Sequence, residues 1–364
     1  MKQWKSKKLG EIATFAKGKG ISKNEVVDNG QTECIRYGEL YTFYGEVISE
    51  IKSKTNTDIS SLVLSEANDV IIPASGETQI DIATASCVIK SGVALGGDLN
   101  IIRTRNNGVF LSYYLNSKKK LEIAKLSQGI SVVHLYSSQL ALLNIKLPQL
   151  EEQEKLASFL SLLNSRIQTQ KKIIEDITTL KIQSRNKLFT QIIKGDYEVF
   201  TIEEILSYEQ PTKYIVSSTD YSSNKSLIPV LTANKAFILG YTNEDWGIYN
   251  KGKCIILDDF TMDLKYVDFP FKVKSSAIKL LTSKNNVDLK FIFEYFSFLN
   301  LSSNEHKRHY ISELQPMLLN VPPIAIQNNL SNFLSKLDEK INLETTLLTQ
   351  YENQKKYLLQ NLFI

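Results

Sequence analysis

The acidic residues 258–265 offer the best candidate in the chain for a hydrolytic site. Asp258, Asp259 and Asp263 stand close together, and Lys265 follows them. Clustered carboxylates can hold the metal ions of a nuclease. They can equally accept hydrogen bonds from cytosine amino groups, or face solvent. No further catalytic motif accompanies them, so we expect no catalytic residue in this chain.

Motifs for group transfer and metal binding are incomplete. The string DFPF (268–271) has Phe269 where the [DNS]-P-P-[YFW] loop of an adenine methyltransferase needs its first proline. The phosphate-binding motif GxxxxGK[ST] is absent. His306 and His309 have no cysteine or acidic partner at the spacing of a zinc site. We therefore expect neither a metal site nor a cofactor, and a protein that binds rather than catalyses.

Side chains suited to nucleic acid occur in the expected loops, where Lys, Arg, Gln, Ser and Thr stand beside Tyr. Such side chains contact phosphates and base edges. In the first half the candidates for DNA binding are Lys17, Lys19, Arg36, Tyr37, Tyr41, Tyr44, Ser75, Thr78, Gln79, Gln128, Ser131 and His134. In the second half they are Lys213, Tyr214, Thr232, Asn234, Lys235, Tyr241, Asp259, Thr261, Lys265, Lys307, Arg308 and His309. Each has an ordinary structural alternative, because a tyrosine can be core packing and a loop lysine can be merely solvated.

The composition is that of an ordinary globular protein, with 364 residues, 43% hydrophobic and 23% charged. This length is typical of two or three domains. Residues 1–195 carry 26 basic and 19 acidic side chains, and this basic excess is compatible with nucleic acid. Cys34, Cys87 and Cys254 are far apart, and no apolar stretch approaches membrane-spanning length. We expect a soluble cytoplasmic protein without disulfides or a signal peptide.

The elements that must position the loops are written twice in the chain. Residues 136–189 match residues 310–363 at a constant shift of 174 without gaps. The identical pairs include Pro148/Pro322, Gln153/Gln327, Leu156/Leu330, Phe159/Phe333, Leu160/Leu334, Ser161/Ser335, Lys181/Lys355, Leu188/Leu362 and Phe189/Phe363. More loosely, KLGEI resembles TIEEI, and DVIIPASGET resembles KCIILDDFTM. The repeat indicates one shared scaffold that carries two divergent blocks.

Each preserved segment predicts a long helix with a heptad seam. The first seam contains Leu156, Leu160, Leu163, Ile167, Ile174, Ile177 and Leu188. The second contains Leu330, Leu334, Leu337, Ile341, Leu348, Tyr351 and Leu362. Polar residues interrupt both seams at matching places, Gln170/Glu344 and Lys181/Lys355. The helices could be core helices of separate domains, but this match favours mutual pairing. We expect them antiparallel about a pseudo-two-fold axis, with a variable block at either end of the pair.

Both variable blocks place short strand-like runs before a helix-like stretch, at 109–126 and 287–299. This order favours an α/β (α+β) fold with mixed sheets. We expect two mixed α/β recognition domains, joined by the antiparallel helices. The expected boundaries are 1–148 for the first domain, 149–195 for the first helix, 196–322 for the second domain and 323–364 for the second helix.

These features resemble the specificity subunit of type I restriction-modification systems. LLNIKLPQLEEQEKLASFLSLLNSRI (142–167) is similar to the I-x-L-P-P-L-x-E-Q motif before that family's first conserved helix, and LLNVPPIAIQNNLSNFLSKLDEKI (318–341) is similar to the second copy. Gln149 replaces the second proline, and Ala325-Ile326 replaces the acidic pair. The resemblance covers the whole chain.

The resemblance implies a function. Each domain would bind one half of a bipartite, asymmetric site in double-stranded DNA, and the helix pair would set the spacer. Two methyltransferase subunits, and nuclease/translocase subunits, would be the partners. S-adenosylmethionine, ATP and Mg would then be bound by those partners. Two alternatives remain open at this point: a coiled-coil adaptor that binds only protein, and a stand-alone DNA-modifying enzyme.

Overall fold

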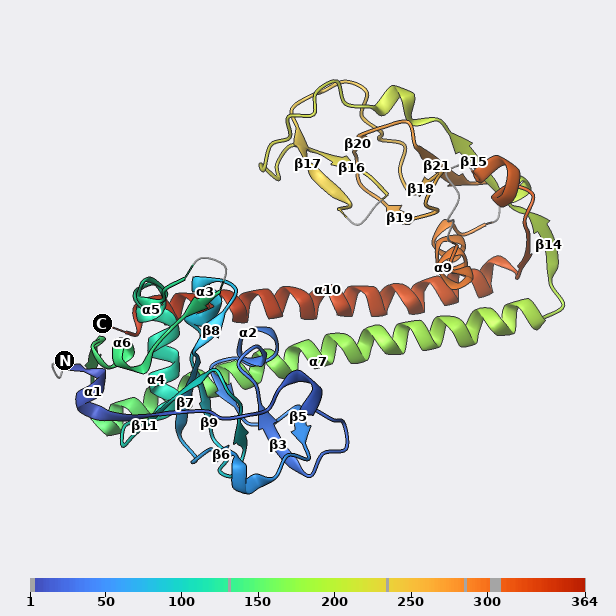
Figure 1. Ribbon diagram of the computed structural model, residues 1–364. Coiled ribbons are helices and arrows are strands. Elements are labelled where there is room, and N and C mark those ends of the chain that lie inside the picture. Colours follow the sequence, from blue (N-terminus) through green and yellow to red (C-terminus); the bar gives the residue numbers. More distant parts are fainter. Residues whose placement is uncertain (1–3, 130–131, 234–235, 285–286, 302–308, 364) are drawn as a thin grey trace. The chain divides into compact units, whose positions relative to one another are not determined.

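A computed structural model describes residues 4–129, 132–233, 236–284, 287–301 and 309–363 (Figure 1). The chain divides into two compact units. Unit 1 comprises residues 1–171 and 346–364, and unit 2 comprises residues 172–345. Each unit therefore contains one α/β domain together with a stretch of each long helix.

The domain of unit 1 contains two mixed sheets. The larger has the strand order β2 (Ala13–Lys17), β11 (Leu99–Thr104), β7 (Asp69–Pro73), β9 (Ser86–Val88) and β4 (Val47–Ile48). The smaller has the order β5 (Ser53–Thr55), β3 (Thr32–Ile35), β10 (Ala94–Leu95) and β6 (Val63–Leu64). Two further pairs are β1 (Lys5–Lys8) with β13 (Asn144–Leu147), and β8 (Ser75–Gly76) with β12 (Val133–His134). The helices are α1 (Leu9–Ile12), α2 (Glu39–Thr42), α3 (Gln79–Ile82), α4 (Gly108–Tyr114), α5 (Lys120–Leu126) and α6 (Ser137–Ala141).

Side chains along a strand point alternately to its two faces, and in this domain both faces of the central strands are buried. Val70 and Ile72 of β7 pack with the aromatic residues of α4. Ile71 packs instead with Leu99 and Ile101 in the core beneath the smaller sheet. The stretch 109–126 is helical throughout, as expected, but Leu115–Lys119 form a π-helical turn between α4 and α5.

Over the residues that the structure describes, the domain of unit 2 repeats this plan with fewer strands. Its larger sheet has the order β15 (Leu206–Glu209), β21 (Ile278–Ser283), β18 (Cys254–Asp258) and β19 (Leu264–Val267). Its smaller sheet has the order β17 (Ile238–Thr242), β16 (Ile228–Leu231) and β20 (Lys272–Val273). The flanking pair is β14 (Glu198–Thr201) with β22 (Leu318–Val321), and the helices are α8 (Ile202–Ile205) and α9 (Leu289–Leu299).

Main-chain hydrogen bonds fix the register of the repeat. The amide of Ala74 donates to the carbonyl of Asp98 at 2.7 Å, and the amide of Asp259 donates to that of Ala277 at 2.9 Å. Ala74 therefore corresponds to Asp259. The sequence match of DVIIPASGET with KCIILDDFTM is one position out of register, because the strand pairing rather than the apolar run decides which residues are equivalent.

The two long helices are α7 (Leu150–Lys194) and α10 (Ile324–Asn361). Gln153 holds the start of α7, because its Nε2 donates to the carbonyl of Pro148 at 3.0 Å and its Oε1 accepts from the amide of Asn107 at 3.0 Å. Asn107 in turn caps α4. The second copy makes the same two bonds, at 2.8 Å each, through Gln327, Pro322 and Asp288.

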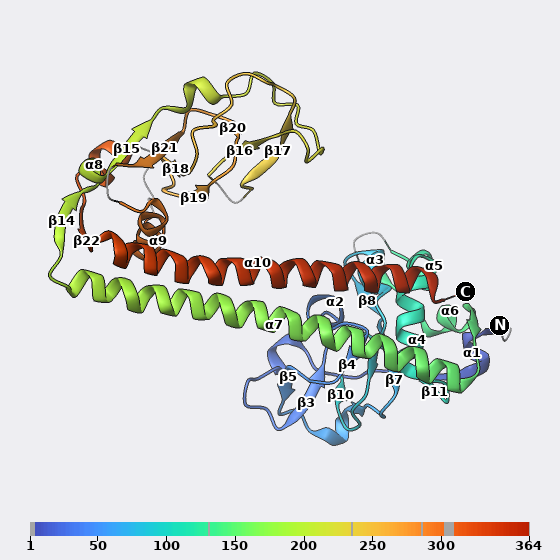
Figure 2. The same ribbon diagram turned by 180° about the vertical axis from the view of Figure 1, so that it is seen from behind.

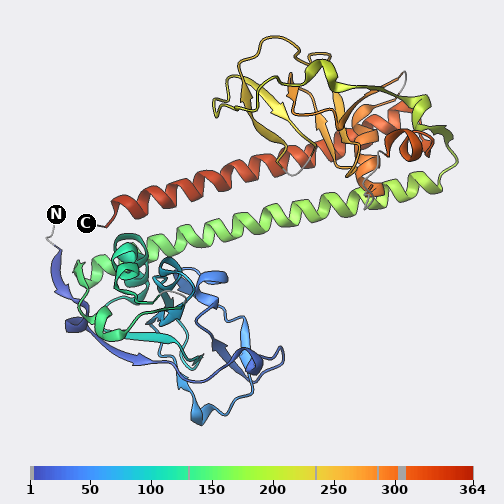
Figure 3. The same ribbon diagram turned by 45° about the horizontal axis from the view of Figure 1, so that its top comes forward.

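Within each unit the stretches of α7 and α10 run antiparallel (Figures 2 and 3). In unit 1, Leu160 near the start of α7 shares a core with Leu359 near the end of α10. In unit 2, Leu188 near the end of α7 shares a core with Leu334 near the start of α10. All fourteen expected seam residues are buried or half-buried, and Gln170, at a polar interruption, is buried.

Candidate nucleic-acid interface

Several loops of unit 1 meet at one edge of its sheets. The amide of Lys19 donates to the carbonyl of Leu95 at 2.9 Å, and that of Ala74 donates to Asp98 at 2.7 Å. These bonds tie the loop after β2, the loop between β10 and β11, and the loop after β7 into one rim. Lys17 and Lys19 lie on this rim with exposed side chains.

Glycines allow this close approach. A Cβ atom on Gly18 would lie 2.0 Å from the carbonyl oxygen of Gly96, so no larger residue fits there. The amide of Gly96 donates to the carbonyl of Ile35 at 2.9 Å. Arg36 and Tyr37 follow directly, and both are half-buried beside the same rim.

Tyr41 of α2 joins this group to the loop after β8. Burial raises the pKa of the Tyr41 hydroxyl, and the nearby Tyr37, Glu77 and Asp81 raise it further, while Arg36 opposes them. The hydroxyl is therefore neutral at physiological pH. A neutral phenol can both donate and accept hydrogen bonds.

The rim is completed by the segments around β12. Gln128 and His134 exchange two main-chain hydrogen bonds, at 2.9 and 2.7 Å, which holds both side chains outward and exposed. Thr78 caps α3, since its Oγ1 accepts from the amide of Asp81 at 3.1 Å. Gln79 follows with an exposed side chain. Among the described candidates of the first half, Lys17, Lys19, Arg36, Tyr37, Tyr41, Thr78, Gln79, Gln128 and His134 are thus carried by connected segments of this rim.

The corresponding rim of unit 2 is held by Asp259. Its carbonyl accepts from the amide of His309 at 3.0 Å, as that of Ala74 accepts from the amide of Leu135 in unit 1. Its carboxylate accepts from the amide of Tyr310 at 2.9 Å and pairs with buried Lys279 at 3.4 Å. Asp259 therefore holds the chain together at this edge.

Exposure divides the candidates. Lys17, Lys19, Thr78, Gln79, Gln128, His134, Lys213 and Thr261 are exposed, and Arg36, Tyr37, Tyr41, Tyr44, Thr232, Tyr241 and Lys265 are half-buried. Ser75, Tyr214, Asp259 and His309 are buried, between 2% and 6% exposed. A side chain without free surface does not reach DNA, so these four expected contacts are corrected to structural residues. Ser131, Asn234, Lys235, Lys307 and Arg308 lie outside the described residues.

Trp246 was not among the residues that the sequence suggested for DNA contact. Its side chain is 55% exposed, and the Nζ of Lys272 lies 3.7 Å from the ring centroid. Lys272 is itself buried and pairs with Glu244 at 2.6 Å. Hydrogen bonds from Lys272 and Ser217 lower the pKa of Glu244 to about 2. The sequence feature that could have marked it as an exposed side chain is its place in the polar run TNEDWG, where it is one of the two tryptophans of the chain.

No group of three or more His, Cys, Asp or Glu side chains is placed to hold a metal ion within the described ranges. Among those same residues, none of the helices is both apolar and long enough to traverse a bilayer.

Comparison with known proteins decides the family. A family model described as the type I restriction modification DNA specificity domain matches residues 1–179 and again residues 194–353. The chain belongs to this family. The specificity-domain protein therefore contains the domain twice, in agreement with the repeat and with the two units.

Relatives of this specificity-domain protein carry the same description. The specificity subunit of the type I restriction enzyme EcoR124I/EcoR124II from Escherichia coli is 40% identical over 175 residues, which are 44% of this chain and 43% of that protein. The match thus spans less than half of that relative. The putative type I restriction enzyme MjaX specificity subunit from Methanocaldococcus jannaschii is 24% identical over 304 residues, 72% of this chain and 70% of that protein.

Solved structures share the fold. The S subunit of a type I restriction-modification system from M. genitalium aligns with a TM-score of 0.72 at 16% identity, covering 99% of this chain and 96% of that one. A chain from a study of complex assembly and conformational transition in a type I system aligns with a TM-score of 0.54 at 15% identity, with the same coverage. The architecture of two mixed α/β domains and antiparallel helices is therefore that of known S subunits.

Proposed function

We propose that this chain is the DNA-specificity subunit of a type I restriction-modification complex in the cytoplasm. Each domain binds one half of a bipartite, asymmetric site in double-stranded DNA, and the helices set the spacer. Methylation and cleavage reside in partner subunits, which bind S-adenosylmethionine, ATP and Mg. The chain itself is not catalytic.

One observation carries this proposal: the same scaffold presents different side chains at equivalent rim positions. Ala74 and Asp259 occupy one equivalent position, with matching main-chain hydrogen bonds. In the neighbouring strands β11 and β21, Asn100 and Lys279 each lie two residues after the carbonyl that accepts this bond, so they also correspond. All four of these side chains are buried, so the preserved main-chain frame is supported differently in the two rims. Differently supported rims on one frame fit two readers of different half-sites.

Exposed aromatic residues support a pair of identical partners. Over 148–189 and 322–363, ranges that the structure describes without gaps, the residues identical in both copies are buried or half-buried with one exception. Phe159 and Phe333 are 46% and 45% exposed. Internal packing does not explain why both copies keep a large exposed ring. We propose that each anchors one methyltransferase subunit.

The test of partner number uses Phe159→Ala, Phe333→Ala and the double variant in the complex with the methyltransferase subunit. Native mass spectrometry should show two partners on the wild type, one on each single variant and none on the double variant. Leu162→Ala is the control, because Leu162 is also exposed but is lysine in the second copy. Equal partner numbers in all variants would reject this role.

The test of DNA specificity is methylation mapping of DNA treated with the chain and its methyltransferase partner. We expect one bipartite sequence with a fixed spacer, and binding that weakens steeply with salt through counterion release. Methylation without a sequence preference, or salt-independent binding, would refute the proposal. The described residues and the comparisons give no support to an adaptor that binds only protein.

A further inference from the structure

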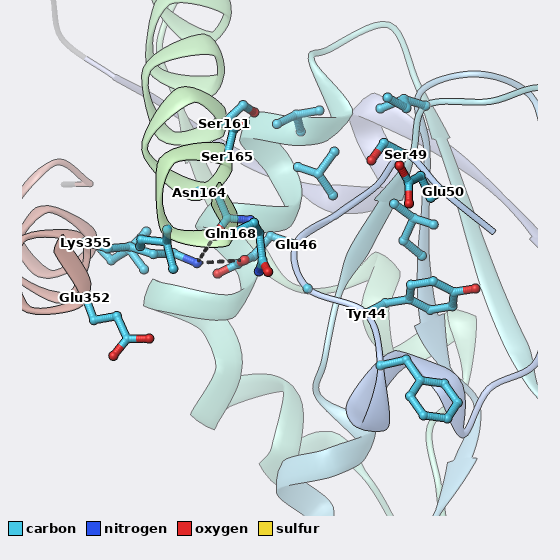
Figure 4. Close-up of a pocket in the computed structure, with 18 of the residues that line it drawn as sticks. Tyr44, Glu46, Ser49, Glu50, Ser161, Asn164, Ser165, Gln168, Glu352 and Lys355 are labelled. Atoms are coloured by element: carbon cyan, nitrogen blue, oxygen red, sulfur yellow. Dashed lines mark hydrogen bonds and ion pairs between the residues drawn. The ribbon is translucent and has the colours of Figure 1, made fainter. Parts of the chain in front are cut away.

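One lysine in unit 1 connects three elements. Lys355 of α10 places its Nζ 3.0 Å from the Oδ1 of Asn164 on α7 and 3.0 Å from the Oε2 of Glu46, in the recognition domain before β4. The ammonium also lies 5.7 Å from the ring centroid of Tyr113 on α4. Lys355 and Glu46 are only 19% and 15% exposed. The contact therefore fixes the recognition domain to both helices at once (Figure 4).

Unit 2 contains the matching contact. Lys181 of α7 places its Nζ 2.6 Å from the Oδ1 of Asp338 on α10 and 3.0 Å from the Oε1 of Glu294 on α9. Glu294 is fully buried and also pairs with Lys290 at 3.3 Å and Arg185 at 3.5 Å. Here too a helix lysine connects both helices and the recognition domain.

The helix part of this contact is preserved, while the domain part is not. Lys181 and Lys355 are 174 residues apart, as are Asn164 and Asp338. The domain anion differs, because Glu46 precedes a strand of unit 1 whereas Glu294 belongs to a helix of unit 2. Two unrelated positions thus supply a carboxylate to the same lysine. This indicates that the connection itself has been retained.

A lysine at this seam position is costly for simple packing. Charged pairs with little exposure stabilise a fold less than well-packed apolar residues of similar size, but they impose one geometry. Other contacts already attach each domain, including the bonds of Gln153 and of Gln327. The lysine contact is therefore suited to fixing orientation rather than attachment.

The surroundings of Lys355 leave space for the domain to turn. Lys355, Glu46 and Asn164 line a groove of about 1240 Å³ between the recognition domain and the helices of unit 1. Ser161, Ser165 and Gln168 of α7 line its polar wall (Figure 4). Because this wall is not part of a close-packed core, steric contact across the groove would not hold the domain in place if the Lys355 contact were lost.

We infer that Lys355 and Lys181 are positioning residues that fix the orientation of each recognition domain on the helices, and thereby the spacer at which both half-sites are bound. This inference rests on the proposed function. Each lysine acts through a carboxylate of its recognition domain, and neither touches DNA. Their removal relaxes the spacer preference without changing the half-site sequences.

The experiment uses the full chain with its methyltransferase partner and a library in which the half-sites are constant and the spacer varies by single base pairs. Wild type should show one preferred spacer. Lys355→Met and Lys181→Met should raise the relative methylation of sites one base pair longer or shorter about ten-fold, which corresponds to about 1.4 kcal/mol. The half-site sequences should stay unchanged.

Two variants distinguish positioning from general damage. Glu46→Gln removes the same ion pair from the domain side and should relax the spacer as Lys355→Met does. Combining Lys355→Glu with Glu46→Lys should restore the wild-type spacer profile. Lys171→Met is the matched control, because Lys171 and Glu352 form an exposed pair at 3.0 Å between the same helices and line the same groove, but have no ion pair with the recognition domain among the described residues.

The outcomes separate this inference from the proposed function. If wild type methylates without any sequence or spacer preference, the proposed function fails, and the inference fails with it. If wild type has a sharp spacer preference and Lys355→Met, Lys181→Met and Glu46→Gln retain it, only the positioning role is refuted. If Lys171→Met relaxes the spacer equally, the effect belongs to helix pairing, and the positioning role is again refuted.

Discussion

The ring of Phe363, just beyond the end of α10, packs edge-on against the ring of Phe110 in α4, with centroids 5.6 Å apart. Unit 2 has an equivalent contact with a different ring angle, in which Phe189 near the end of α7 packs against Phe291 in α9 with centroids 5.3 Å apart and the rings tilted by 37°. The end of α10 thus places a phenylalanine in the core of the first domain, which precedes α7 in sequence. The end of α7 places one in the core of the second domain, which precedes α10.

This packing predicts a large loss of stability for Phe363→Ala and Phe189→Ala. Both side chains are fully buried or nearly so, and truncation of a buried phenylalanine costs about 3–5 kcal/mol. Denaturant unfolding, with hydrogen exchange to locate the change, should place each effect in its own unit. Phe159→Ala is the control, expected within about 0.5 kcal/mol because that ring is exposed. A small effect of Phe363→Ala would contradict the packing described.

Gln153→Ala should loosen the junction between α7 and α4. The substitution leaves the amide of Asn107 and the carbonyl of Pro148 without their partner, at a cost of about 1–3 kcal/mol. Hydrogen exchange of the Asn107 amide should accelerate. Gln168→Ala, at an exposed position of the same helix, should change neither quantity. Gln327→Ala should accelerate hydrogen exchange of the Asp288 amide in the same way. Unchanged exchange of that amide would argue that the glutamine does not hold this junction.

The three cysteines should be unreactive in the folded protein. All are buried, and burial raises the pKa of Cys34 to about 11 and those of Cys87 and Cys254 to about 12. At pH 8 the thiolate that attacks a disulfide reagent is therefore scarce. Titration with Ellman's reagent should show no fast thiol in buffer and three in guanidinium chloride. One rapidly reacting thiol in buffer would refute this.

Glu244 should stabilise unit 2 in a pH-dependent manner. Its folded pKa of about 2 lies below the ordinary value of 4.5, so its contribution is complete above pH 4.5 and is lost as the pH falls toward 2. Glu244→Gln also leaves the buried Lys272 without its counter-charge. The variant should have a lower melting temperature than wild type at pH 7, and the two melting temperatures should converge as the pH falls from 4.5 to 2. Asp245→Asn, an exposed neighbour, should leave the wild-type pH profile intact.

The long helices were predictable because packing imposes a period that the residue types reveal. Leu160 and Leu334 occupy seam positions that any antiparallel pair must bury. The π-helical turn at Leu115–Lys119 within the helical stretch 109–126 was not predictable, since it leaves the apolar pattern unchanged. Lys181 and Lys355 were recognised as polar interruptions, but their partners Glu46 and Glu294 depend on tertiary structure.

The rim residues show the same limit. Lys17, the last residue of β2, and Gln128 are both exposed, as expected of polar side chains at a strand end and in a loop. Asp259 is buried because Lys279, on a neighbouring strand, neutralises it. Tyr214 is buried because its hydroxyl donates to Glu209 at 2.9 Å. Residue type alone does not show which of these side chains finds such a partner, so it could not separate contact from support.

The strand pairs that flank each domain have an evolutionary consequence. Lys5 lies opposite Leu147 in β1–β13, and Glu198 lies opposite Val321 in β14–β22, so the chain enters and leaves each domain at adjacent points. A module with neighbouring ends can be exchanged by recombination without disturbing the framework that carries it. Under the proposed function, exchange of one such module changes one half of the target site and leaves the rest of the chain unchanged.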